Sequence, residues 1–171
     1  MNNYFLSKLT LSDYVPFKDF VEQYCNFKLD KHAEFYQKGI NDFENFVNKL
    51  NASELDPIDG WPRTFSFWLR TAKQDILGGF RIRLVTTNSD LYKYGHIGYD
   101  ISPRHRGKGL GYVILKLGIL EAKKLNLKEL TAIVNKNNIQ SIRILDKLSN
   151  LEIYSNSNLN LSDRCFVITI D

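Results

Sequence analysis

A short glycine-rich segment between a predicted strand and a predicted helix constrains this chain more than any other feature. Residues 95–102 (GHIGYDIS) are typical of a β-strand, and the apolar residues from 110 to about 125 predict a long helix. Between them lies Arg106-Gly107-Lys108-Gly109-Leu110-Gly111. The first N–H groups of a helix have no partner within it, and glycines let an anion approach them closely. The segment therefore predicts a phosphate-binding loop, with a simple turn as the alternative.

Two familiar nucleotide-binding patterns do not fit this segment. A P-loop needs a hydroxyl residue directly after its lysine to hold magnesium, whereas Gly109 follows Lys108 here. The dinucleotide fingerprint GxGxxG needs another spacing, because the glycines at 107, 109 and 111 are two residues apart throughout.

Periodicity in the rest of the chain predicts one α/β domain over residues 1–171. We expect strands at 3–11, 64–71, 77–87, 95–102, 130–134, 151–154 and 165–170, and helices at about 12–26, 42–50, 110–125 and 139–148. The second and third strands should form an antiparallel hairpin. The long helix between the fourth and fifth strands favours parallel pairing of those two. The prediction is a mixed, twisted sheet with helices on both faces.

The charge pattern argues against nucleic acid as a partner. The net charge is +4, but the 23 basic residues are interspersed with 19 acidic ones, and only residues 104–108 (RHRGK) concentrate positive charge. A duplex usually requires a long basic stripe, whereas a short basic cluster among glycines suits a phosphorylated small molecule.

Other sequence features argue against zinc and against a membrane. Cys25 and Cys165 are far apart, without a CxxC pair or a Cys/His cluster, so we expect two free thiols and no metal site. No segment has the apolar length needed to cross a bilayer, and the N-terminus lacks the features of a secretory signal. We expect a cytoplasmic location.

The glycine segment resembles the signature R/Q-x-x-G-x-G/A of the GNAT N-acetyltransferases, with Arg106, Gly109 and Gly111 at its defined positions. The resemblance extends over residues 96–151 and includes an N-x-x-S segment at Asn138 and Ser141. The pairing of GWPRTFSFWL with GHIGYDISPRHRGKG also resembles an uncharacterised bacterial subgroup of predicted acetyltransferases. This resemblance implies that residues 1–94 form the acceptor side and residues 95–171 bind acetyl-CoA.

The resemblance also implies a set of cofactor contacts. Backbone amides of the loop would bind the pyrophosphate of coenzyme A, the strand around Tyr99 and Ile101 would pair with the pantetheine amides, and Asn138 would contact the cofactor arm. The implied cofactor-binding residues are Tyr99, Ile101, Arg106, Gly107, Lys108, Gly109, Leu110, Gly111, Asn138 and Ser141.

Acetyl transfer to an amine needs protonation of the leaving thiolate. In the family a tyrosine seven residues after the motif asparagine often serves as this acid, but Leu145 stands at that position here. We expect Leu145 to pack its helix against the sheet. Tyr154 on the next strand and water are the alternative proton donors.

The amine must also lose a proton before it attacks, and two residues are candidates for the base. His96 and Asp100 lie four residues apart on one strand, and therefore on one face if the strand is regular. The alternative for His96 is a structural imidazole, and for Asp100 an ion pair with Arg104 or Arg106.

These observations predict an enzyme that moves acetyl from acetyl-CoA directly to a primary amine of a small molecule or peptide. No Cys or Ser has a recognisable paired His, which disfavours an acetyl-enzyme intermediate. Because Leu145 replaces the usual acid, a non-catalytic module that binds or senses acyl-CoA remains an alternative. A homodimer is possible, but nothing in the sequence decides this. Four aromatic residues could line an acceptor pocket or fill the core: Trp61, Phe65, Phe67 and Trp68.

Overall fold

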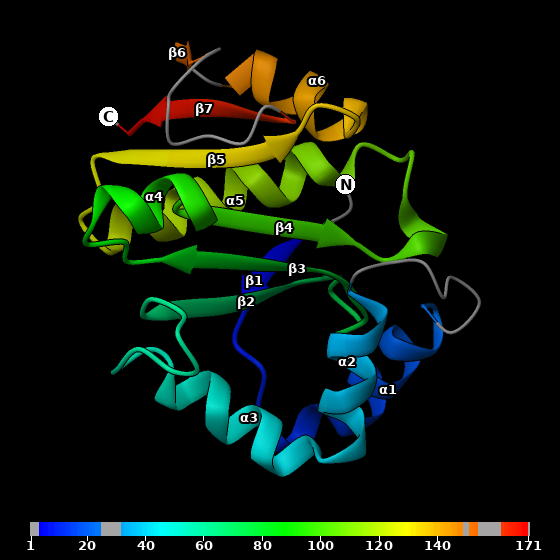
Figure 1. The fold of residues 1–171 in the computed structure, drawn as a ribbon. Coiled ribbons are helices and arrows are strands. Elements are labelled where there is room, and N and C mark those ends of the chain that lie inside the picture. The colour runs from blue at the N-terminus through cyan, green and yellow to red at the C-terminus, as the bar shows by residue number, and fades with distance from the viewer. Residues whose placement is uncertain (1–3, 25–31, 149–150, 154–161, 171) are drawn as a thin grey trace.

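Figure 1 shows the order and the arrangement of the helices and strands. The structure, a computed structural model, describes residues 4–24, 32–148, 151–153 and 162–170. The strands are β1 (Phe5–Ser7), β2 (Thr64–Arg70), β3 (Ile76–Arg83), β4 (Ile97–Ile101), β5 (Glu129–Asn135), β6 (Leu151–Ile153) and β7 (Asp163–Thr169). The helices are α1 (Tyr14–Glu22), α2 (Ala33–Asn41), α3 (Phe43–Ala52), α4 (Asn88–Tyr94), α5 (Leu110–Lys124) and α6 (Ile139–Leu148).

The described strands form two sheets that meet at β4 and β5. The first has the order β1-β2-β3-β4 and the second β5-β7-β6, and neighbours within each sheet are antiparallel. β4 and β5 lie side by side and point the same way (Figure 1), and the N–H of His96 donates to the carbonyl of Thr131 at 2.7 Å. The expected parallel direction is therefore seen, but the expected ladder is wrong for the described residues, because β4 and β5 belong to separate sheets. The α/β class and the β2–β3 hairpin are confirmed.

Two hydrophobic clusters hold helices against opposite faces of the first sheet. α5 packs on one face, where its Ile114 and Leu115 belong to the same cluster as Phe80 and Ile82 of β3. α1, α2 and α3 cover the other face through a second cluster that includes Phe17, Phe20, Tyr36, Val47 and Trp68. The expectation of helices on both faces is confirmed.

α2 and α4 are absent from the sequence prediction. α4 begins with the polar run Asn88-Ser89-Asp90, which reads as a loop, but the Thr87 hydroxyl accepts from the Asp90 N–H and caps a helix there. α2 contains Gly39, which lowers helix propensity. A Cβ at Gly39 would approach the Phe46 ring to 2.9 Å, so glycine allows α2 to pack closely on α3.

Two further expectations concern thiols and membranes. Cys165 is a free cysteine buried in β7, whereas Cys25 lies outside the described residues. No helix in the described part of the chain is long and apolar enough to span a bilayer.

Gly118 sets the spacing between α5 and β3, and we expect Gly118→Ala to destabilise the fold. A Cβ at this position would overlap the buried ring of Phe80. Alanine gains about 1 kcal/mol in helix propensity, but overpacking a core costs about 1–3 kcal/mol, so the net change in the free energy of unfolding should be a loss. Denaturant unfolding measures it. Lys116→Ala on the exposed side of α5 is the control, and an unchanged or higher stability of Gly118→Ala would contradict the packing argument.

Candidate functional site

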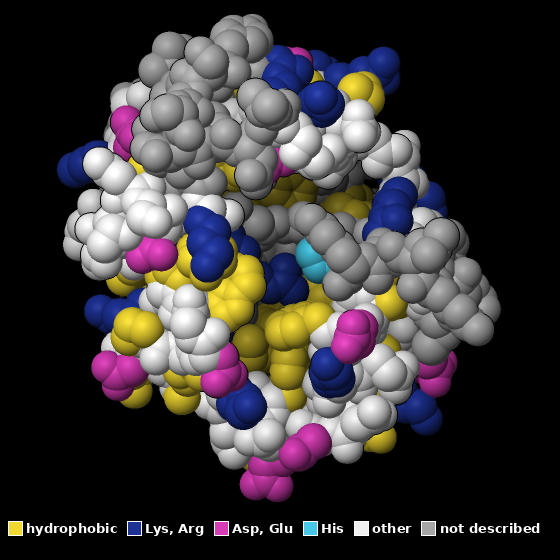
Figure 2. All heavy atoms as spheres, in the orientation of Figure 1, with side chains coloured by type: hydrophobic (Ala, Val, Ile, Leu, Met, Phe, Trp, Pro, Cys, Tyr) yellow, Lys and Arg dark blue, Asp and Glu magenta, His cyan; other side chains and the backbone are white. Residues whose placement is uncertain are grey.

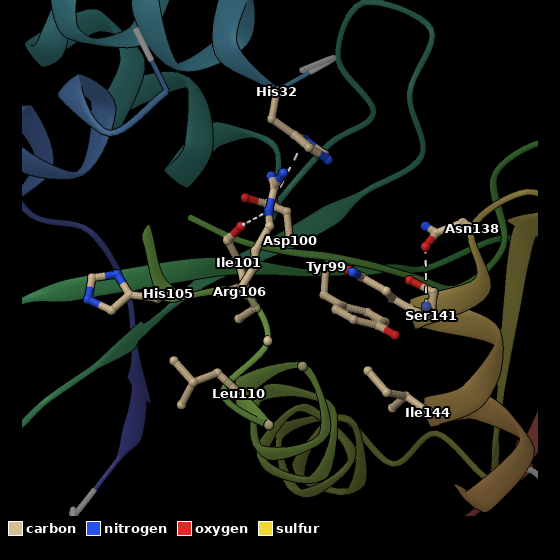
Figure 3. Close-up of a pocket in the computed structure, with 14 residues that line it drawn as sticks. His32, Tyr99, Asp100, Ile101, His105, Arg106, Leu110, Asn138, Ser141 and Ile144 are labelled. Atoms are coloured by element: carbon tan, nitrogen blue, oxygen red, sulfur yellow. Dashed lines mark hydrogen bonds and ion pairs between the residues drawn. The ribbon is translucent and has the colours of Figure 1, made fainter. Parts of the chain in front are cut away.

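A cavity of about 620 Å³ lies at the carboxyl end of β4, where the chain turns into α5 (Figure 3). This volume is in the usual range for small-molecule sites. β4, the glycine loop and the first turns of α5 and α6 supply most of its wall, and His32, next to α2, completes it. The lining residues are His32, Tyr99, Asp100, Ile101, His105, Arg106, Gly107, Gly109, Leu110, Gly111, Asn138, Gln140, Ser141 and Ile144.

The backbone of the loop presents a row of N–H groups to this cavity. Gly107 and Gly109 have φ values of 74° and 77°, in the left-handed region that favours glycine. The N–H groups of Tyr112 and Val113 already turn back to the Gly109 carbonyl. Within the described chain, no backbone carbonyl accepts from the N–H groups between Gly107 and Gly111. The loop is therefore suited to an anion.

The side chains of the loop have other tasks. Arg106 Nε donates to the Ile101 carbonyl at 2.9 Å, which ties the loop to the end of β4 (Figure 3). Lys108 does not line this cavity but a neighbouring one. Nine of the ten cofactor residues predicted from the sequence thus surround one cavity, and Lys108 lies beside it.

α6 closes the cavity on the side of β5. Asn138 Oδ1 accepts from the Ser141 N–H at 3.2 Å and caps the helix. Gly111 allows α5 to begin close to α6, because a Cβ there would approach Ile144 Cδ1 to 2.7 Å. The Tyr99 ring lies between the two helices (Figure 3), and its buried hydroxyl has no hydrogen-bond partner among the described residues. Burial raises the pKa of this phenol, which keeps it protonated near neutral pH.

Asp100 is the centre of a buried polar network on the opposite face of β4. Tyr24 Oη donates to Oδ2 at 2.6 Å, and Tyr36 Oη donates to Oδ1 at 2.8 Å. Arg81 Nη1 donates to Oδ1 at 3.0 Å, so the ion-pair partner of Asp100 is Arg81 of β3. The suggested pairing with the loop arginines is wrong, because the register of β3 and β4 places Arg81 near the carboxylate.

The charge state of Asp100 follows from this network. Burial raises the pKa of the carboxyl, but the positive charge of Arg81, the charge that His32 carries when it is protonated, and the donated hydrogen bonds outweigh it. The pKa of Asp100 is therefore lower than usual, and the carboxylate remains ionised at neutral pH. Burial lowers the pKa of Arg81, but the neighbouring Tyr36 and Asp100 outweigh it, so this pKa is raised.

His32 connects this network to the cavity. Its Nδ1 lies 3.7 Å from Asp100 Oδ1, and its ring stacks on Tyr36 with centroids 6.1 Å apart. The side chain is 23% exposed and points from the edge of α2 toward β4 (Figure 3). No motif surrounds His32 in the sequence, so it is not among the predicted site residues. The contact with Asp100, 68 positions further on, exists only in the folded chain.

The other predicted catalytic residues lie elsewhere. His96 does not line the cavity, and its Nδ1 accepts from the Thr131 N–H at 3.0 Å, which joins β4 to β5. Burial lowers the pKa of His96, since the weaker effect of Glu129 does not compensate. Tyr154 lies outside the described residues. Leu145 is completely buried in α6, which confirms its expected packing role.

Of the four aromatic candidates for an acceptor pocket, three pack in the core and one is exposed. Phe67 and Trp68 are buried in the two core clusters, and Phe65 packs against the first. Trp61 is 48% exposed, with its ring centroid 4.5 Å from that of Tyr94. No group of three or more His, Cys, Asp or Glu side chains that could hold a metal ion occurs among the described residues.

Comparison with known proteins agrees with this fold and this site. The model of the acetyltransferase (GNAT) domain family matches residues 6–149, whereas no curated protein sequence matches the chain. The ribosomal-protein-S5-alanine acetyltransferase from Vibrio fischeri is similar in structure, with a TM-score of 0.64, 19% identity and coverage of 100% of this chain and 97% of that one.

Two further solved structures have the same fold. The microcin C7 self-immunity acetyltransferase MccE, in complex with acetyl-CoA and AMP, has a TM-score of 0.64 and 13% identity, covering 98% of this chain and 92% of its own. The spermidine/spermine N-acetyltransferase SpeG from Vibrio cholerae has a TM-score of 0.61 and 12% identity, covering 98% and 95%. Because the family model spans most of the sequence, this chain belongs to the GNAT acetyltransferases, and it is an acyltransferase that uses acetyl-CoA and an amine acceptor.

Proposed function

We propose that the protein transfers acetyl directly to a primary amine of a small molecule or peptide, and that His32 deprotonates this amine. The observation that carries the proposal is that one cavity contains both the unpaired loop amides and the imidazole beside Asp100. Bound acetyl-CoA supplies the thioester carbonyl that the amine attacks.

The residues around the loop fit the cofactor in two ways. The N–H groups from Gly107 to Gly111 have no backbone acceptor in the described chain and are free to donate to a diphosphate. In the β3–β4 ladder, residues 96 and 102 bond toward β3, so Tyr99 and Ile101 direct their backbone groups toward the opposite edge of β4. That edge carries no ladder in the described residues. Apart from the Ile101 carbonyl, which accepts from Arg106, its backbone groups are open to the amides of an extended ligand.

We propose that His32, rather than His96, is the base. Asp100 holds a negative charge next to His32 Nδ1 and favours proton uptake by the ring. The amine nitrogen then forms a bond to the carbonyl carbon as the carbon–sulfur bond breaks, and the nitrogen releases its second proton to water, which leaves a neutral amide. The thiolate takes a proton from water or from Tyr154, because Leu145 cannot donate one.

Gly109→Val tests the cofactor loop. We expect the affinity for acetyl-CoA to fall about tenfold or more, about 1.4 kcal/mol, because a branched residue opposes the left-handed backbone that directs the amides. Calorimetric titration measures the dissociation constant. Gly60→Val is a matched control, since Gly60 also has a positive φ of 76° and open space at its Cβ but lies outside the cavity. Equal affinities of the two variants would remove the loop assignment.

An amine panel tests catalysis itself. The protein is mixed with acetyl-CoA, a thiol reagent and single amines, and release of free thiol is followed. Turnover with any amine supports the proposal. Tight binding of acetyl-CoA without turnover on any amine would contradict it and favour the acyl-CoA-sensing alternative.

A further inference from the structure

We infer that the acceptor carries an anionic group, a carboxylate or a phosphate, in addition to its amine, and that Arg83 binds this group. The inference rests on the proposed function and specifies the chemical class of its acceptor. Three observations carry it: the face on which Arg83 lies, the glycine beneath its guanidinium, and the charges around it.

Arg83 lies on the face of the first sheet that carries the Asp100 network, which we call the acceptor face. Gly79, Arg81 and Arg83 alternate along β3, so they share a face. A Cβ at Gly79 would meet Tyr36 Oη and Asp100 Oδ1, which identifies this face as the one that carries the Asp100 network. Figure 2 shows a hollow on this side of the molecule, with basic side chains and a histidine inside it and hydrophobic side chains around it.

Gly98 brings the Arg83 guanidinium onto β4. A Cβ at Gly98 would meet Arg83 Nη2 at 3.0 Å and Nη1 at 3.3 Å, so the guanidinium lies directly over this glycine. Gly98 and Asp100 are two residues apart on one strand, about 7 Å along its axis. An acceptor whose amine lies at His32 and Asp100 can therefore extend a second group along β4 to Arg83.

The two arginines on this face differ in whether a carboxylate balances their charge. Asp100 compensates Arg81, but the described residues provide no carboxylate for Arg83. Arg83 Nη1 donates to the Tyr94 carbonyl at 3.2 Å, and its guanidinium lies 5.4 Å from the centroid of the Trp61 ring. Burial and the charge of Arg81 lower the pKa of Arg83 to about 10, so it is still a cation at neutral pH. A largely buried cation without a counter-ion is unfavourable, and an anionic ligand would compensate it.

An acceptor with further positive charge fits this face poorly. Arg81 and Arg83 lie on alternate positions of β3, and a polyamine placed along β4 would bring like charges close to Arg83 in a partly dehydrated site. A carboxylate or a phosphate would instead accept charge-assisted hydrogen bonds from the guanidinium. The geometry thus separates anionic amines from polycationic ones.

Arg83 could instead have a purely structural role and hold α4 against the loop that carries Trp61. Steady-state kinetics distinguishes this role from binding of an anionic acceptor. We compare 4-aminobutyrate with 4-aminobutyramide, phosphoethanolamine with ethanolamine, and 1,4-diaminobutane, at saturating acetyl-CoA. In the wild type we expect kcat/KM to favour the preferred anionic amine about tenfold or more over its neutral analogue. The pair with the larger difference in kcat/KM shows whether the site prefers a carboxylate or a phosphate.

Arg83→Gln should abolish this preference, mainly by raising the KM of the anionic amine while the KM of acetyl-CoA remains unchanged. Arg83→Lys keeps the charge and should retain part of the preference. Arg63→Gln is the matched control, because Arg63, like Arg83, donates to a backbone carbonyl. Its Nε and Nη2 both bond to the carbonyl of Glu54. This variant should alter stability but not acceptor preference.

Two results would overturn the inference. One is an equal kcat/KM for anionic and neutral amines in the wild type, and the other is an Arg83→Gln variant in which kcat/KM falls by the same factor for both kinds of amine. If no amine is acetylated, calorimetric titration of the same amines into the protein with coenzyme A replaces kinetics. Binding of an anionic amine that Arg83→Gln abolishes would then support the inference while the proposed function fails. Absence of such binding would refute it.

Discussion

His32→Gln should lower kcat/KM for the amine by about a hundredfold or more near pH 7, with little change in acetyl-CoA affinity. An alkyl amine with a pKa near 10 arrives almost entirely as ammonium at this pH and cannot attack until it loses a proton. Glutamine keeps polar atoms and much of the volume of histidine, but it cannot take up that proton. Steady-state rates over a pH series measure the effect.

The pH dependence separates a lost base from a damaged site. The free-amine fraction rises about tenfold per pH unit below the pKa of the amine, so alkaline solution should partly restore His32→Gln. A variant whose acceptor site is distorted would stay impaired at every pH.

His96→Gln is the matched comparison, because it makes the same substitution at a histidine that does not line the cavity. We expect a lower melting temperature from the weakened contact with Thr131 and a kcat/KM within a few-fold of the wild type. The opposite pattern, with His96→Gln inactive and His32→Gln active, would assign the base to His96.

Much of the cofactor side could be predicted from sequence because its signals are local. The α5 helix continues directly from the glycine loop, and both have short-range patterns in periodicity and residue type. α6 was predicted with its observed bounds, Ile139–Leu148, since its apolar positions recur at helical spacing. Leu145 at the usual position of the acid could also be read from the sequence. A leucine side chain has no ionisable proton, and its complete burial shows that it has a packing role instead.

The acceptor side could not be predicted because its contacts join distant segments. Asp100 receives hydrogen bonds from Tyr24 and Tyr36, which are 76 and 64 residues away in the sequence. In the sequence the nearest candidate partners of Asp100 are the arginines of the loop, whereas the register of the antiparallel β3–β4 pair brings Arg81 to it. No periodicity or motif marks His32, and its role depends on where α2 packs on the sheet.

Asp100→Asn should have the largest effect on stability of any single change at the site. The substitution keeps the size of the side chain but leaves the Arg81 guanidinium without its counter-ion in a buried network. Removing one partner of a buried ion pair typically costs about 3–5 kcal/mol. Denaturant unfolding at about pH 7 measures this loss. Asp146→Asn is the control, since Asp146 is exposed and its pair with Arg164 spans 4.0 Å, so about 0–1 kcal/mol is expected.

Unfolding measurements in acid test whether the charge of Asp100 causes this loss of stability. The pKa of Asp100 is lower in the folded protein than its ordinary value of 3.8, so the carboxylate stabilises the fold fully above about pH 4. This contribution is lost as the pH falls through the folded pKa, because the unfolded chain takes up the proton first. The gap in unfolding free energy between wild type and Asp100→Asn should therefore be constant near neutrality and narrow below about pH 4. A gap that persists unchanged in acid would mean that Asp100 acts through hydrogen bonding and shape alone, and that its charge does not anchor Arg81 or His32.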